Sequence, residues 1–202
     1  FMDFTTGGRL ATRLHDIGEA PGGRTGTTVR FWPDPIVFDE TRFRAQTLLE
    51  RFQMMAFLNR GLEIRFHDLR EGSGGSSAEV IYQYKGGISD FVEHVNASKE
   101  SLFSSVGYFA DRESDQEVEV AFQWNTGFNT DGLHSFANGI NTVEGGMHEE
   151  GFRSALTSVV NKYARRRGVI RDKDDNLQGE DIREGLTAII SVRLVDPQFE
   201  GQ

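Results

Sequence analysis

The spacing of apolar residues changes along the chain between helical and strand periods, and this pattern predicts an α+β fold. Apolar residues recur at every third or fourth position over residues 39–59, 88–95 and 149–163, which is the spacing of one helix face. Alternating or β-branched apolar runs predict strands. The predicted strands cover residues 1–4, 27–32, 62–66, 80–84, 102–110, 118–124, 133–137 and 186–195. We therefore expect a mixed sheet with helices on one side.

Gly-rich and polar segments between these elements predict connecting loops. They cover residues 5–25, 71–77 (expected to be a flexible tip) and 171–179. Pro33 and Pro35 flank Asp34, and prolines hold the backbone extended and lack an amide donor. We therefore place a domain boundary there, with residues 1–34 ending one domain and residues 35–202 forming the next.

Composition narrows the classes of function. The chain has 202 residues, enough for one large domain or for a domain plus part of another, and it contains no cysteine. Disulfides and thiolate metal sites are thereby excluded, and a reducing cytoplasm fits this composition. No segment approaches the ~20 apolar residues of a membrane span, so we expect no membrane partner. The formal net charge of −9 means that any contact with nucleic acid must come from a local basic patch.

The usual signatures of catalysis are absent from the sequence. No Gly-x-x-x-x-Gly-Lys-Ser/Thr phosphate loop occurs, and the histidines lack the His-Glu-x-x-His spacing of zinc hydrolases. His148, Glu149 and Glu150 are the nearest approach to a metal-binding cluster, but neighbours at a loop–helix junction rarely converge on one ion. We therefore predict no metal site and no complete catalytic constellation.

Some stretches are distinctive enough to compare with a known family. Residues 138–153 read Asn-Gly-Ile-Asn-Thr-Val-Glu-Gly-Gly-Met-His-Glu-Glu-Gly-Phe-Arg. Residues 25–34 read Thr-Gly-Thr-Thr-Val-Arg-Phe-Trp-Pro-Asp, and residues 196–202 read Asp-Pro-Gln-Phe-Glu-Gly-Gln. Together they resemble the B-type subunits of bacterial type IIA DNA topoisomerases, a family that includes gyrase B and its topoisomerase IV counterpart. The resemblance covers nearly the whole chain and is weakest at residues 5–24 and 68–80.

The resemblance implies a transducer domain with the rare left-handed βαβ crossover of the ribosomal-protein type. Ahead of it would lie the terminal strands of a GHKL ATP-binding domain. In this resemblance Thr27 contacts adenine, partly through an ordered water, and Val29 lies against the base. Gln202 would contact the γ-phosphate of ATP, in a loop that continues with Thr-Lys in the family. Met147 stands where the family usually has Thr, so the hydroxyl is missing at that position.

A DNA-facing surface is also implied. Arg153 lies about 100° around its helix from Phe152 and so can leave the apolar stripe. In the family this Arg faces the cavity through which a duplex passes. A basic run closes the same helix: Lys162, Arg165, Arg166, Arg167 and Arg171. Its charges either complement the helix C-terminus or contact DNA phosphates in a salt-sensitive way, and the sequence leaves both open.

The resemblance implies an ATP-dependent DNA topoisomerase in which this chain couples ATP binding and hydrolysis to gate closure and strand passage. ATP and Mg²⁺ would serve the full enzyme. The expected partners are DNA, a gyrase A-type subunit in an A₂B₂ heterotetramer, and a second copy of the B-type chain joined through the ATPase gate. The catalytic residues of the ATPase precede residue 1 in the family, so we expect this chain alone neither to hydrolyse ATP nor to bind it tightly.

Other functions remain open at this point. The B-type subunit of topoisomerase IV shares these motifs. A non-catalytic module that binds RNA or a protein could use the same fold. The mismatch-repair ATPases share the two-domain layout, but they lack the motif of residues 138–153.

Overall fold

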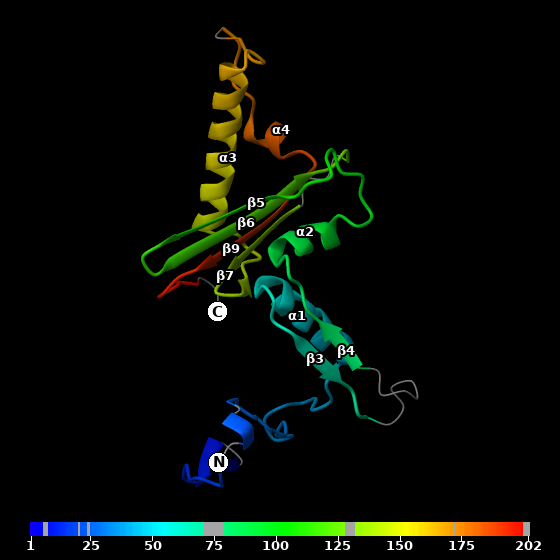
Figure 1. Ribbon diagram of the computed structural model, residues 1–202, viewed down its shortest axis with the longest axis vertical. Helices are drawn as coiled ribbons and strands as arrows, with labels where there is room; N and C mark the ends of the chain where they lie inside the picture. Colours follow the sequence, from blue (N-terminus) through cyan, green and yellow to red (C-terminus); the bar gives the residue numbers. More distant parts are fainter. Residues whose placement is uncertain are drawn as a thin grey trace. The chain divides into compact units, whose positions relative to one another are not determined.

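The computed structural model describes most of the chain, in seven stretches: residues 1–5, 8–19, 21–23, 25–70, 79–127, 132–171 and 173–199. The predictions for residues 71–77 and for Gln202 fall outside these ranges. The chain divides into two compact units, Phe1–Arg44 and Ala45–Gln202, which are coloured from blue to red along the sequence in Figure 1. The domain boundary expected after residue 34 stays a prediction.

The first unit contains little regular structure. β1 (Asp3–Thr5) pairs antiparallel with β2 (Arg9–Thr12), and a short 3₁₀ helix, η2, spans Pro21–Gly23. β1 overlaps the strand predicted at the start of the chain, whereas β2 lies in a segment predicted to be a loop. The prediction of a strand over residues 27–32 is wrong. These residues have the composition of a strand, but they form none in the structure. A strand is stable only when a neighbour satisfies its backbone groups, and the described part of this unit offers it none.

A five-stranded sheet forms the centre of the second unit, with strand order β5-β6-β9-β7-β8. The strands are β5 Gly107–Glu113, β6 Gln116–Trp124, β7 Leu133–Ala137, β8 Ile140–Asn141 and β9 Leu186–Arg193. β9 follows the other strands in sequence but lies in the middle, where it pairs antiparallel with β6 and parallel with β7. The predicted α+β fold with a mixed sheet is therefore confirmed.

Helices cover both faces of this sheet. α2 (Ile88–Val95) packs against β6 and β9 on one side, and α3 (Met147–Arg166) contacts β9 from the other (Figure 1). The expectation of helices on one side only is wrong. The reason lies in β9, where every residue from 186 to 192 is buried, so that both faces of this strand need a cover.

A helix and a hairpin lie beside α2. α1 (Ala45–Leu58) contacts α2 and the hairpin of β3 (Ile64–His67) and β4 (Glu79–Tyr82). Side chains along both strands alternate between half-buried and exposed, as the sequence predicts. α1 begins at Ala45 rather than at residue 39, while its C-terminal end lies close to the predicted one.

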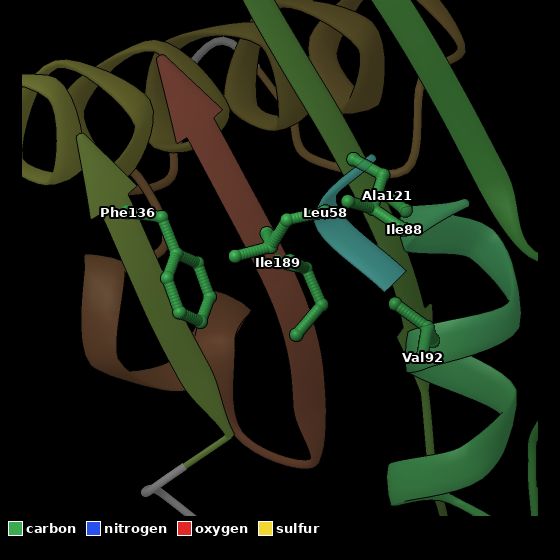
Figure 2. Packing of buried hydrophobic residues seen from close by; sticks show 6 residues of the cluster. All are labelled: Leu58, Ile88, Val92, Ala121, Phe136 and Ile189. Atoms are coloured by element: carbon green, nitrogen blue, oxygen red, sulfur yellow. The ribbon is translucent and has the colours of Figure 1, made fainter. Parts of the chain in front are cut away.

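The hydrophobic core lies where α1, α2 and the sheet meet. It consists of Leu58, Ile88, Val92, Ala121, Phe136 and Ile189, none of them more than 4% exposed (Figure 2). These residues come from α1, α2, β6, β7 and β9, so the cluster ties the sheet to the helices on this face. Burying each large aliphatic or aromatic side chain of this kind stabilises a fold by about 1.5–3 kcal/mol.

The chain turns sharply twice between β7 and α3. Asn138 and Gly139 have positive φ angles of 51° and 79°, as the two-residue hairpin between β7 and β8 requires. Gly145 has a φ of 78° and is followed by Gly146, which caps α3. The predicted glycine break before this helix is therefore confirmed. Together the turns bring the start of α3 back to β7.

Candidate functional site

α3 and the short helix α4 (Gly179–Arg183) line a groove of about 710 Å³. Its cations are Arg153, Lys162 and Arg165 on α3 and Arg183 on α4, and the only acidic residue on its described walls is Glu150. The groove is therefore locally positive in a chain whose formal net charge is −9. A local basic patch of this kind is what the composition requires of a nucleic-acid contact.

The cations of the groove differ in how far they are free to bind a ligand. Within the described residues, Lys162 and Arg183 have no side-chain hydrogen bond or ion pair. The Arg165 guanidinium donates to Asn176 Oδ1 at 2.8 Å and to the carbonyl oxygens of Arg171 and Asp174 at 3.0 and 2.8 Å. Arg165 thus holds the loop after α3, and Lys162 and Arg183 are the freer donors.

Arg166 and Arg167, at the end of α3, lie outside the groove. Their guanidinium carbons are 5.8 and 5.6 Å from the centre of the Tyr163 ring, a distance at which a cation is attracted to an aromatic face. Both are also at the helix C-terminus, where positive charge is favourable. Arg171 forms an ion pair with Asp174 at 2.8 Å. The side chains of Arg166, Arg167 and Arg171 therefore have partners within this chain, and both interpretations of the basic run stay open.

Arg153 is held by an ion pair on its own helix. Its Nη2 and Nε donate to Glu149 Oε1 at 2.6 and 3.0 Å. Glu149 also accepts a hydrogen bond from Ser135 Oγ of β7 at 2.8 Å. Burial acts to raise the pKa of Glu149, but the hydrogen bonds from Arg153 and Ser135 outweigh it and lower this pKa. The carboxylate is thus ionised at neutral pH and faces Arg153 as a full negative charge.

A chain of hydroxyl groups connects this ion pair to His148. The Ser135 and Thr142 oxygens are 2.7 Å apart, and Thr142 Oγ1 is 3.1 Å from His148 Nε2. Each hydroxyl has one proton. The Ser135 hydroxyl donates to Glu149 Oε2 at 2.8 Å, and this direction is consistent with donation from Thr142 to Ser135 and from His148 Nε2 to Thr142. Burial lowers the pKa of His148, partly opposed by Glu149, which favours the neutral ring.

Buried polar contacts fix the other wall of the groove. Trp124 Nε1 donates to the Ile182 carbonyl at 2.9 Å and so holds α4 against β6. Asn161 on α3 donates to the Leu177 carbonyl at 3.0 Å and accepts from the Leu177 amide at 2.8 Å. The segment leading into α4 is thereby paired with α3, which places Arg183 opposite the cations of that helix.

Sequence reasoning assigned no site role to Arg183 and predicted no helix at α4. The helix has a capping box in which Gln178 and Asp181 exchange hydrogen bonds with each other's backbone. The usual signature of this motif begins with Ser or Thr, so Gln178 conceals it. A helix of this length also has too few turns to show apolar periodicity.

Of the residues expected to contact ATP, the structure describes Thr27 and Val29, which lie on the surface of the first unit. Thr27 and Val29 are exposed, Val29 at 79%, so the described residues do not themselves enclose a base there. Gln202 lies outside the described residues. Among the described residues no group of His, Asp and Glu side chains is arranged to hold a metal ion. No helix in the described part of the chain has both the length and the apolar composition needed to span a bilayer.

Comparison with known proteins identifies the family. The sequence model described as DNA gyrase B matches residues 87–202. The chain is 48% identical over 210 residues to the DNA gyrase B of Mycobacterium tuberculosis, covering 91% of this chain and 31% of that protein. The chain belongs to the DNA gyrase B family. It is also 51% identical over 199 residues to the novobiocin-sensitive gyrase B of Streptomyces niveus, covering 88% of this chain and 29% of that protein.

Solved structures agree with this assignment. The 43K ATPase domain of Thermus thermophilus gyrase B, in complex with an aminocoumarin, matches with a TM-score of 0.82 and 34% identity, covering 96% of this chain and 51% of that chain. The topoisomerase IV ATP-binding domain of Francisella tularensis matches with a TM-score of 0.77 at 21% identity and covers 96% and 51%, which shows the fold alone. The chain spans about a third of the length of the gyrase B relatives that it matches.

Proposed function

We propose that this chain is the coupling part of a gyrase B protein, which links ATP binding and hydrolysis to the passage of a DNA duplex. Membership of the gyrase B family supports this proposal. The coupling would be a rigid-body movement between units rather than bond breaking. The proposal includes the left-handed sense of the crossover from β7 through α3 to β9.

The observation that carries the DNA-binding part of the proposal is the positive groove between α3 and α4. Lys162 and Arg183 have no partner among the described residues, so their donors can meet phosphate, and Arg153 lies on the same wall. Phosphate contacts by such side chains give salt-dependent affinity without sequence preference. Arg165 adds positive charge, although its donors hold the neighbouring loop. Arg166 and Arg167 would contribute at the end of α3.

ATP would be held between this chain and residues that come from elsewhere in the full protein. Thr27 and Val29 are exposed and therefore able to meet a base, with Gln202 assigned to the γ-phosphate. When bound, ATP with Mg²⁺ would supply the γ-phosphate. The gate would close or open according to whether that phosphate is present or has been lost. The side chains of Phe31 and Trp32, which follow Val29, are 66% and 78% exposed and form an apolar surface for the same contact.

The partners follow from the same assignment. They are DNA, a gyrase A-type subunit in an A₂B₂ heterotetramer and a second copy of the B-type chain at the ATP-operated gate. The setting would be the bacterial cytoplasm. We expect no hydrolysis of ATP by this chain alone; Mg²⁺-dependent phosphate release in a coupled assay at saturating ATP would contradict that part of the proposal.

The groove is tested by binding a short fluorescent DNA duplex to the full chain at low salt. Lys162→Ala combined with Arg183→Ala should weaken binding several-fold and lower the slope of log affinity against log salt by about 1 per lost phosphate contact. The matched control for each single groove variant, Lys162→Ala or Arg183→Ala, is Arg112→Ala on β5, which also removes one positive charge but outside the groove. Equal losses from the control and from either groove variant would show a general charge effect and contradict the proposal.

A further inference from the structure

The ion pair between Glu149 and Arg153 occupies one edge of the guanidinium and leaves another free. Glu149 Oε1 accepts from Nε and Nη2, the side edge of the planar fork. No hydrogen bond or ion pair engages Nη1 within the described residues. A guanidinium has five donors in a fixed plane, so the end edge with Nη1 can still meet an anion. The Arg153 side chain is 33% exposed and lines the groove.

Glu149 is itself held in place. Its side chain is 13% exposed, and its second oxygen, Oε2, accepts the hydrogen bond from Ser135 on β7. Thr142 and His148 in turn orient the Ser135 hydroxyl, as described above. Arg153 is thus held in place by a strand of the central sheet, through Glu149 and Ser135, although its own side chain is flexible.

The neighbouring Glu150 provides a contrast on the same turn of α3. Its side chain is 75% exposed, and its carboxylate is 3.9 Å from Arg153 Nε. No side-chain hydrogen bond holds it within the described residues. Glu149 and Glu150 therefore place equal charges near Arg153, but only Glu149 is anchored to the sheet.

We propose that Glu149 is a positioning residue, which holds Arg153 with its free edge toward the groove so that it can bind a DNA phosphate. This rests on the proposed function of the groove. The anchored carboxylate restricts a long side chain that would otherwise sample many rotamers, and a donor that is already oriented loses less entropy on binding.

The sign of one mutational effect separates positioning from simple charge. Removing a carboxylate makes the surface less negative, so charge alone predicts that Glu149→Ala and Glu150→Ala both strengthen DNA binding. Positioning predicts the opposite for Glu149 only. We expect Arg153→Ala to weaken binding about fivefold, which corresponds to the loss of a charge-assisted contact of about 1 kcal/mol. Glu149→Ala should weaken it about threefold, because the Arg153 donors remain but are no longer held in place. Glu150→Ala should leave affinity unchanged or raise it.

The experiment is titration of the fluorescent duplex with the full chain over a range of salt concentrations. A Glu149→Ala change added to Arg153→Ala should have no weakening effect, because the positioned group is gone. Ser135→Ala, which changes no charge, should weaken binding in the same direction by a smaller factor. In the free chain, the Nε–H resonance of Arg153 should be observable by NMR and broaden or disappear in Glu149→Ala, with circular dichroism confirming the fold of each variant.

The possible outcomes distinguish this inference from the function on which it rests. Strengthened binding by Glu149→Ala, equal to that of Glu150→Ala, overturns the positioning role. If Lys162→Ala and Arg183→Ala weaken binding but Arg153→Ala does not, the groove function stands and the role of Glu149 falls. If none of these changes alters affinity or salt slope, both proposals fail.

Discussion

The two units of the chain bury their aromatic residues to very different extents. In the first unit Phe31 and Trp32 are 66% and 78% exposed, whereas in the second Phe57 and Phe136 are 2% and 1% exposed. Both sets occur in segments with strand or helix character. An apolar pattern therefore becomes structure only where other elements supply hydrogen-bonding partners and a surface to pack against.

The largest expected effect tests this contrast directly. Phe136→Ala should lower the free energy of unfolding by about 3–5 kcal/mol, because it leaves a cavity in the core. Trp32→Ala should change it by less than about 0.5 kcal/mol, since an exposed side chain loses little on truncation. Urea unfolding followed by circular dichroism measures both. Similar losses from the two substitutions would mean that the first unit has a packed core of its own.

A medium effect is expected where a buried amide joins α3 to the segment before α4. Asn161→Ala removes the hydrogen bonds with both backbone groups of Leu177, and should lower the free energy of unfolding by about 2 kcal/mol. The amide of Leu177 should then exchange with solvent faster. Ser158→Ala, on an exposed position of the same helix, is the control and should have little effect. No change in Leu177 exchange would show that this pairing does not hold the groove wall.

The smallest effect is a pH dependence that arises from two histidines of the second unit. Burial, and to a lesser degree Lys99, lowers the pKa of His134, and burial lowers that of His148. In both cases the unfolded state binds protons more readily, so stability is complete above the unfolded pKa of about 6.5 and falls as the pH drops below it. Solvent screening keeps the loss to about 1 kcal/mol or less by pH of about 5.5.

Urea unfolding at about pH 8 and about pH 5.5 measures this dependence. His134→Gln with His148→Gln should flatten it. A pH dependence that survives the double substitution would assign it to other groups.

Helices and strands that end at glycines, or where the apolar spacing stops, can be predicted from the sequence. The apolar pattern predicts β7 with its observed bounds, and α2 follows the expected glycines and apolar spacing. β5 begins at Gly107 rather than at residue 102, although the amide of Leu102 does donate to the Trp124 carbonyl at 2.9 Å. Apolar residues occur at 102, 103 and 106, but regular pairing with β6 begins only at Gly107. Pairing depends on both segments, so one segment alone does not predict it.

The candidate site can be predicted only in part, for a related reason. The Glu149 and Arg153 pair has the i,i+4 spacing that brings side chains together on a helix, so it is open to prediction. Ser135 and Arg183 reach the same region from elements distant in sequence, and no local pattern indicates that. The sequence places Arg165 in a basic run that suits either a helix end or a DNA contact, while the loop that accepts its hydrogen bonds can be located only in the folded chain.

The position of β9 has a consequence for how the second unit folds. The strand at the centre of the sheet is the last of the five to be synthesised, and its partners β6 and β7 precede it by many residues. Until β9 arrives, the facing edges of both partners are open to pairing with other chains. Sheets closed by such distant contacts form slowly, so the nascent chain passes through a period in which it is prone to aggregation. The β5–β6 hairpin has a short connection, so we expect it to form first, before β9 pairs with β6.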